Sequence, residues 1–241
     1  MKIYLFLFPA LLGFCTVNGQ TGIGPEAGFG VSYEHLVPSL PFQQVSLQTQ
    51  TSVRIGGSLD ARLNKHIYLQ AGVFFAVKGG QAEYYYHLSD SENQYVNRTM
   101  NERYLEAPVN VVFKTGMQGK GRFFAGLGAS PSYLVGGNGD WNYHGKTGGV
   151  PFAGSHTENL TNGQAIKPFD IGMNVTAGYE WASGWYVRLL YLPGIKDIGN
   201  AGQVEKNRTF TLSVGYYFGK GRNINQETDD LIDHTAAQPA Q

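Results

Sequence analysis

The side chains best suited to acid–base chemistry in this chain are its six histidines. A hydrolase or acyltransferase needs a histidine beside a nucleophile and an orienting carboxylate. No histidine falls within a nucleophile motif such as G-x-S-x-G, so the sequence predicts no enzyme. The six are His35, His66, His87, His144, His156 and His234.

Metal and cofactor chemistry finds equally little support in the spacing of donor residues. His144 and His156 share a segment with Asp140 and Glu158, but their spacing fits no zinc pattern. The glycine-rich stretch 136–140 lacks the regular oxygen ligands of an EF-hand loop. We therefore expect no metal and no cofactor. The 18 basic and 18 acidic residues balance, which predicts no nucleic-acid partner.

The first 19 residues have the three-part pattern of a secretory signal peptide. Lys2 precedes an apolar stretch, and Val17-Asn18-Gly19 precedes the expected cut. A lipoprotein signal with Cys15 acylated is the alternative, although Phe14 is large for the position before that cysteine. No later segment offers about 18 consecutive apolar residues, so only a closed barrel could cross a bilayer.

Alternation of apolar and polar residues is the dominant pattern of the rest of the chain. This period of two is typical of strands with one apolar face. Most runs are about 10 residues long, which suits a tilted strand that crosses a bilayer. The eight runs are 23–34, 53–63, 67–78, 105–114, 123–133, 169–180, 185–192 and 209–218.

Short and long connections alternate between these runs. The short ones are 64–65, 116–120 and 182–184, and the long ones are 36–50, 79–103, 136–167 and 193–207. This is the arrangement of outer-membrane barrels, with short periplasmic turns and long extracellular loops. We expect an all-β, eight-stranded antiparallel up-and-down transmembrane β-barrel over 20–219, followed by a flexible polar tail over 220–241. The tyrosines at 84–86 favour a continuation of the third strand above the membrane.

Charged residues alternate with the apolar ones and would line the interior. An eight-stranded barrel has an interior just wide enough for side chains. Acids and bases in near balance could pair there, which predicts a plugged lumen. The expected lumen charge network comprises Glu26, Glu34, Arg54, Asp60, Arg62, Lys78, Glu106, Lys114, Asp170, Glu180 and Arg188.

Aromatic residues lie near the ends of several apolar faces. Tryptophan and tyrosine concentrate at the two membrane interfaces of such barrels. The expected interface aromatics are Tyr33, Phe113, Tyr133, Tyr179, Trp181, Trp185, Tyr191 and Phe218.

Three segments resemble the outer-membrane β-barrel domain family that includes PorT-like proteins. They are Tyr104-Leu105-Glu106-Ala107-Pro108, the run from Phe169 to Glu180, and the closing run from Asn207 to Phe218. The resemblance covers about residues 21–219. It implies a Gram-negative outer-membrane location, and it implies that the barrel-assembly machinery reads Phe218, here followed by a tail.

The sequence thus predicts an integral outer-membrane barrel with a plugged polar lumen and surface-exposed loops. Its role would be structural or binding within the envelope, with secretion as one context. Outer-membrane lipid, the assembly machinery and envelope proteins are the expected partners. Two alternatives stay open: a secreted, soluble, lipocalin-like ligand-binding barrel, whose apolar face would line the cavity, and a lipid-modifying barrel enzyme.

Overall fold

The computed structural model describes residues 21–37, 43–89, 92–116, 120–162, 166–200 and 204–218. The predicted signal peptide over 1–19 and the predicted tail over 220–241 lie outside these residues. No helix in the described part is long and apolar enough to cross a membrane.

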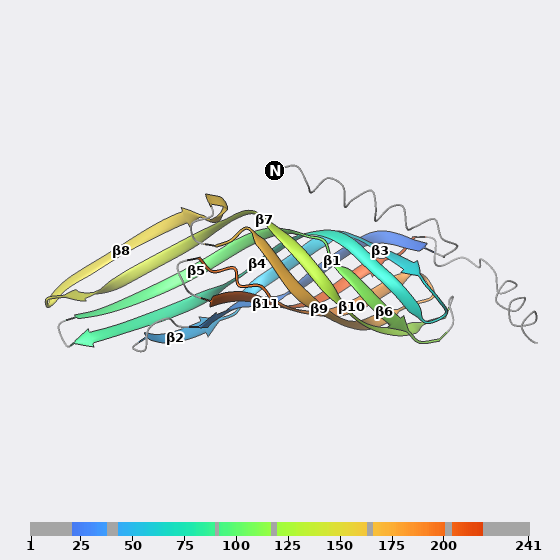
Figure 1. The fold of residues 1–241 in the computed structure, drawn as a ribbon, viewed down its shortest axis with the longest axis horizontal. Helices are drawn as coiled ribbons and strands as arrows, with labels where there is room; N and C mark the ends of the chain where they lie inside the picture. The colour runs from blue at the N-terminus through green and yellow to red at the C-terminus, as the bar shows by residue number, and fades with distance from the viewer. Residues whose placement is uncertain are drawn as a thin grey trace, which may run out of the picture.

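The described chain is built almost entirely of antiparallel strands (Figure 1). The strands are β1 (Thr21–Val37), β2 (Gln43–Gln48), β3 (Gln50–Arg62), β4 (Ile67–Ser89), β5 (Glu92–Glu106), β6 (Val109–Lys114), β7 (Arg122–Thr147), β8 (Val150–Asn159), β9 (Phe169–Glu180), β10 (Trp185–Pro193) and β11 (Val204–Tyr216). One turn of 3-10 helix, η2 (Leu160–Asn162), follows β8.

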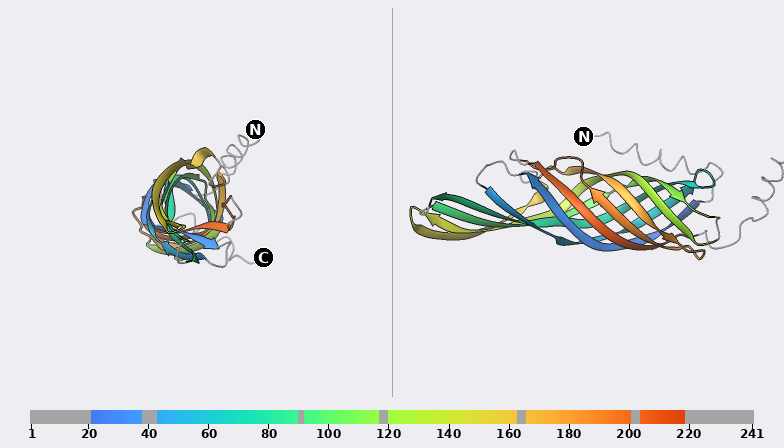
Figure 2. Two further views of the ribbon diagram at one scale, coloured as in Figure 1. Left: turned by 90° about the vertical axis from the view of Figure 1, so that its left-hand side faces the viewer. Right: turned by 90° about the horizontal axis from the view of Figure 1, so that it is seen from below.

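Eight strand positions close into a ring, which is visible end-on in Figure 2. β1 pairs with both β3 and β11, so the sheet has no edge within the ring. β5 and β6 occupy one position, because each pairs with β4 on one side and β7 on the other. The predicted eight-stranded up-and-down barrel is confirmed.

The fourth predicted strand, 105–114, is not continuous. It breaks at Ala107 and Pro108, between β5 and β6. Proline has no amide hydrogen to donate to the ladder, so it interrupts a strand in the middle of a sheet. The Pro108 carbonyl still accepts a hydrogen bond from Gly72 at 3.1 Å, which keeps the barrel closed at the break.

Tight turns join strands at one end of the barrel, as the sequence predicts. Asn64 Oδ1 accepts hydrogen bonds from the amides of His66 and Ile67 at 2.9 and 2.8 Å. Gly184 adopts a φ of 96°, which favours glycine, and closes the turn between β9 and β10. Phe218 donates its amide to the Ile23 carbonyl, so both ends of the described barrel chain lie at this turn end.

At the opposite end, strands project well beyond the ring (Figures 1 and 2). β2, β4, β5, β7 and β8 form this extension sheet, in that order. A register shift at Arg103/Tyr104, opposite Val135, marks where it leaves the ring. Such bulges are common at barrel rims.

The prediction of loops over 36–50, 79–103 and 136–167 was therefore wrong in large part. These segments carry β2, the outer halves of β4 and β5, and most of the β7–β8 hairpin. They lack a continuous apolar face, so alternation did not reveal them, whereas backbone pairing simply continues along the ring strands. The predicted continuation of the third strand through Tyr84–Tyr86 is confirmed, since β4 runs to Ser89.

The two faces of the ring have opposite character. Large apolar side chains point outward, with Phe29, Phe123 and Leu189 exposed by 65%, 66% and 62%. Charged side chains point inward and are buried, among them Glu26, Lys114 and Arg122. Hydrophobic burial is thus inverted relative to a water-soluble barrel.

Candidate functional site

Glu26 on β1 is the centre of one buried ion-pair group. Its Oε1 accepts a hydrogen bond from Arg54 Nη1 at 2.8 Å. Its Oε2 accepts from Tyr186 Oη at 2.8 Å and from Arg188 Nη1 at 2.9 Å. Arg54 also reaches Glu106 Oε2 at 3.2 Å. Three charge-assisted bonds from two other strands, β3 and β10, therefore satisfy this carboxylate inside the ring.

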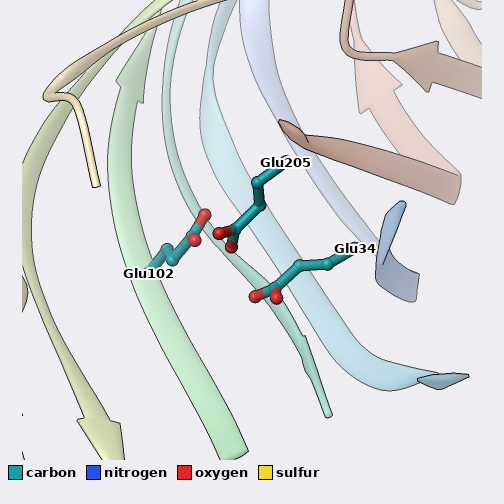
Figure 3. Close-up of side chains that lie close together, drawn as sticks. All are labelled: Glu34, Glu102 and Glu205. Atoms are coloured by element: carbon teal, nitrogen blue, oxygen red, sulfur yellow. The ribbon is translucent and has the colours of Figure 1, made fainter. Parts of the chain in front are cut away.

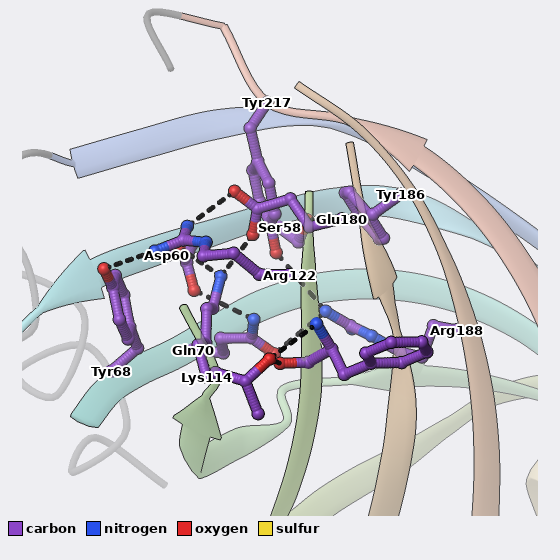
Figure 4. Close-up of polar contacts among 12 residues, drawn as sticks. Ser58, Asp60, Tyr68, Gln70, Lys114, Arg122, Glu180, Tyr186, Arg188 and Tyr217 are labelled. Carbon is purple, nitrogen blue, oxygen red and sulfur yellow. Dashed lines mark hydrogen bonds and ion pairs between the residues drawn. The ribbon is translucent and has the colours of Figure 1, made fainter. Parts of the chain in front are cut away.

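A second group lies nearer the turn end (Figure 4). Lys114 Nζ lies 2.9 Å from Asp60 Oδ2 and also bridges to Glu180 Oε2. Arg122 pairs with Glu180 Oε1 at 2.7 Å and donates to Tyr68 Oη at 2.6 Å. These side chains come from β3, β4, β6, β7 and β9, so their contacts cross the interior. Each charge meets opposite charge, as buried ions require.

Pairing is less complete toward the extension end. Lys78 Nζ lies 2.7 Å from Glu106 Oε1. Asp170 is fully buried, and within the described chain neither of its carboxylate oxygens has a hydrogen-bond partner. Arg98 Nη2 lies 2.7 Å from Glu205 Oε1, and its Nη1 lies 3.7 Å from Glu34 Oε2.

Three carboxylates converge just inside this end of the ring. Glu34, Glu102 and Glu205 each present one oxygen within 4.8 Å of the other two, and all three residues are buried (Figure 3). Asn207 Nδ2 donates to Glu102 Oε2 at 2.7 Å. The carboxylates come from β1, β5 and β11, strands that meet only because the ring closes.

A cap of apolar side chains is buried at the extension end. Leu160 and Ile166 are wholly buried and pack on the inward-facing Met100, Tyr104 and Leu134. Ile198 is also wholly buried. The Lys167 amide donates to the Ile198 carbonyl at 2.8 Å, which ties the segment after β8 to the segment after β10. Apolar side chains from two connections are thus buried at this end of the ring.

Ten of the eleven residues expected in the lumen charge network are buried within the ring. Arg62 differs: it is half-buried at the turn end, and its Nε donates to the Asn64 carbonyl at 3.1 Å. Sequence reasoning missed four buried charges, Arg98, Glu102, Arg122 and Glu205. Each of the four lies an even number of positions from an inward-facing residue of the neighbouring apolar run, as Glu102 does from Glu106. Extending the alternation beyond the runs would therefore have placed them inside the barrel.

A family model described as "Outer membrane protein beta-barrel domain" matches residues 18–200. The chain belongs to this outer-membrane β-barrel family. The protein is therefore an outer-membrane protein, and its outward apolar face meets lipid. The soluble lipocalin-like alternative is wrong, because it would place the apolar face inside.

Several solved outer-membrane proteins resemble this barrel. Neisserial surface protein A is 13% identical, with 81% of this chain and 97% of that chain covered and a TM-score of 0.37. Ail of Yersinia pestis, in complex with the heparin analogue sucrose octasulfate, is 12% identical, with coverages of 83% and 99% and a TM-score of 0.37. OprG of Pseudomonas aeruginosa is 7% identical, with coverages of 83% and 96% and a TM-score of 0.46. A comparison with curated protein sequences gives no match.

The eight aromatics expected at the membrane interfaces all avoid the interior of this outer-membrane barrel. Five are exposed, namely Phe113, Tyr133, Trp181, Trp185 and Phe218. The other three, Tyr33, Tyr179 and Tyr191, are half-buried. Outward rings contact one another near the turns, where Tyr179 packs edge-on against Trp181 at a centroid distance of 5.1 Å. A role at the interface remains a prediction for all eight.

The extension sheet of this outer-membrane protein continues the inward face of the ring as an aromatic surface. Trp141 on β7 contacts His156 on β8, with ring centroids 6.1 Å apart. Tyr143 contacts Phe152 in the same way at 6.5 Å. The opposite face carries a separate set, in which Tyr95 and His144 lie 4.9 Å apart. The histidines at 87, 144 and 156 thus belong to this sheet, and none of them lies in the ring.

Proposed function

We propose that this outer-membrane barrel is a non-conducting anchor that presents its extension sheet to a protein partner outside the cell. Short turns are periplasmic in such barrels, which assigns the turn end to the periplasm and the extension to the cell surface. The observation that carries the proposal is the contrast between an ion-paired, capped interior and a broad sheet that leaves the ring.

Two observations support the plugged lumen. Ion pairs such as Lys114–Asp60 and Arg188–Glu26 cross the ring between strands that are not neighbours. The tyrosines 68, 186 and 217 are buried with Val112 and Phe124 in an interior cluster near the turn end. Long side chains of both kinds fill the narrow space that eight strands enclose.

Two observations support a binding sheet. Its inward face presents Trp141, Tyr143 and Phe152, which are only partly buried, and large aromatic side chains dominate protein–protein hot spots. Within the described chain, β2 pairs only with β4 and β8 only with β7, so each leaves a backbone edge that a partner strand could extend.

The proposal also covers how the barrel is inserted into the membrane and which cellular process it serves. The assembly machinery would insert the barrel through its closing strand, whose Phe218 is exposed on the outward face. The resemblance to PorT-like proteins supports an envelope partner, with secretion as the process served. The aromatic sheet and the filled interior support a binding role over a catalytic one.

The lipid-modifying enzyme is the competing hypothesis. His66 lies in the turn between β3 and β4, where its Nδ1 is 3.0 Å from the Lys114 carbonyl and its ring stacks on Phe113. Both contacts suit a structural imidazole. Alanine at His35 or His66 is expected to leave the lipid A profile of the cell unchanged, and an altered profile would favour the enzyme.

Two measurements test the anchor proposal. Purified protein in a planar bilayer is expected to give no steady single-channel current, and stable openings of the wild type would refute the plug. For the sheet, surface-tagged protein carrying Tyr143→Ser and Phe152→Ser is expected to capture less envelope or secreted protein than the wild type. The matched control is Tyr85→Ser with Tyr95→Ser on the opposite face. Equal loss in both pairs, or no loss in either, would count against the aromatic face.

A further inference from the structure

We propose that Glu34, Glu102 and Glu205 bind one divalent cation, with Ca²⁺ the best fit, inside the extracellular end of the barrel. The carboxylate groups point toward one another from three strands (Figure 3). The site does not depend on the proposed partner of the extension sheet.

The charge balance of the interior calls for such an ion. The buried acids among the described residues number eight and the buried bases six. The acids are Glu26, Glu34, Asp60, Glu102, Glu106, Asp170, Glu180 and Glu205, and the bases are Arg54, Lys78, Arg98, Lys114, Arg122 and Arg188. The difference, 6 − 8 = −2, is the charge that one divalent cation neutralises. Buried carboxylates without compensating positive charge destabilise a fold, so the two excess negative charges must be neutralised.

The deficit lies at the proposed site. Lys114, Arg122 and Arg188 are all bonded to carboxylates in the groups around Glu26 and Glu180. At the three-carboxylate cluster, the base within ion-pair distance in the described chain is Arg98. Three carboxylates and one guanidinium give this cluster a net charge of −2, which equals the net charge of all the buried charged side chains together.

Polar atoms around the cluster lack the partners that burial demands. Within the described chain, three oxygens of the cluster have no hydrogen-bond partner. They are both carboxylate oxygens of Glu34 and Oε1 of Glu102. Two residues outside the cluster add to this. Asn207 is wholly buried, its amide nitrogen bonds Glu102, and its Oδ1 has no partner in the described residues. The wholly buried Tyr104 hydroxyl also has none there, although it lies within electrostatic reach of Glu102 and Glu205. Native proteins rarely leave so many buried polar atoms unsatisfied without water or an ion.

The donors favour Ca²⁺ over other metals. Carboxylate, amide and hydroxyl oxygens are hard ligands, which suit Ca²⁺, Mg²⁺ or Mn²⁺ and not Zn²⁺ or Cu²⁺. Mg²⁺ dehydrates reluctantly and usually keeps several waters, whereas Ca²⁺ accepts a flexible set of about six to eight oxygen ligands. The cluster offers oxygens from three buried carboxylates, so it suits Ca²⁺ better than Mg²⁺. The apolar cap over Tyr104 would shield a bound ion from bulk water and slow its exchange.

The test measures Ca²⁺ bound to the detergent-purified full barrel. Protein stripped with a chelator and dialysed against ⁴⁵Ca²⁺ is expected to take up one ion per chain. Ca²⁺ is also expected to raise the temperature at which the barrel unfolds. Glu102→Gln is expected to weaken binding at least about tenfold, since it removes one charged ligand. Glu92→Gln, on the exposed end of the same strand, is the matched control and should bind like the wild type.

The wild-type result alone decides the central point, because it does not depend on any variant folding. If the wild type binds no Ca²⁺ and gains no thermal stability from it, the proposal is overturned, and shared protons must balance the carboxylates instead. Binding that Glu102→Gln retains in full, with the barrel still heat-modifiable on a gel, would overturn the assignment equally. One ion per chain in the wild type and in Glu92→Gln, with loss in Glu102→Gln, supports it.

Discussion

Arg54 and Glu26 face each other inside the barrel with Nη1 and Oε1 2.8 Å apart, and both side chains are at most 5% exposed. Neither residue could hold its charge there alone. Each belongs to a chain of contacts that continues through Arg188 on one side and Glu106 on the other.

Arg54→Met should therefore destabilise the barrel strongly. The change leaves Glu106 and Glu26 each with one fewer cation in a buried site. Removing one partner of a buried ion pair costs about 3–5 kcal/mol. Urea unfolding from phospholipid vesicles, followed by tryptophan fluorescence, measures the free energy. Arg62→Met, at the half-buried turn end, is the control and should cost less than about 1 kcal/mol. Equal costs would show that the interior pairs contribute little.

Leu189→Arg should destabilise the barrel from the lipid side. Leu189 lies in the middle of β10 and is 62% exposed on the outward face. Arginine at the bilayer midplane of such barrels costs about 2–4 kcal/mol, and the cost falls to about 0–1 kcal/mol near the interface. Val204→Arg, at the extension end of β11, is the interfacial control. A similar free energy of unfolding for both variants would contradict the placement of the membrane on the ring.

Gly215→Ala should be far less tolerated than Gly57→Ala. A Cβ at Gly215 would lie 2.3 Å from the Tyr186 ring, and it would push that ring away from Ser58 and Glu26. Overpacking of this kind costs about 1–3 kcal/mol. A Cβ at Gly57 meets its nearest atom at 3.8 Å, so alanine there should be neutral or slightly stabilising. Thermal unfolding of the two variants checks the order, and a reversal would refute the packing of Tyr186.

Asp197 should stabilise the connection between β10 and β11 in a pH-dependent manner. The amide of Glu205 donates to Asp197 Oδ1 at 2.9 Å, and the amide of Gly199 donates at 3.0 Å. The hydrogen bond from the Glu205 amide is the largest cause that holds the pKa of the Asp197 carboxyl below its usual range. The bond from the Gly199 amide and the neighbouring Lys167 lower this pKa further. A lowered carboxyl pKa stabilises the folded form above the ordinary value near 4, and the effect is lost as pH falls through the lowered pKa.

Hydrogen exchange at the Glu205 and Gly199 amides measures this effect. Their protection should fall as pH drops below about 4, beyond the intrinsic change in exchange rate. Asp197→Asn should lower the protection at neutral pH and abolish the extra pH dependence. Asp140→Asn on β7, whose Oδ1 accepts from Thr157, should leave these two amides unchanged. Protection in Asp197→Asn that still tracks pH like the wild type would rule out Asp197 as the titrating group.

The sequence by itself determined the strands and the faces of the ring. Successive side chains of a strand point to opposite sides, so parity placed Phe29 outside and Glu26 inside without any knowledge of contacts. It also placed Asp60, Lys114 and Glu180 together on the polar face, and short turns such as 64–65 fixed which strands are antiparallel neighbours. These are local properties of a few consecutive residues.

Only the tertiary structure decided which side chains contact each other across the interior and how far the strands extend. Contacts across the interior, such as Lys114 with Asp60, depend on the tilt and register of the closed ring, which no single strand encodes. Apart from the continuation of β4, the extension was hidden because its strands lack a continuous apolar face, and backbone pairing with neighbouring strands keeps them extended. Glu102 and Glu205 lay in segments expected to be loops, so the convergence of their carboxylates with Glu34 emerged only when the ring closed between β1 and β11.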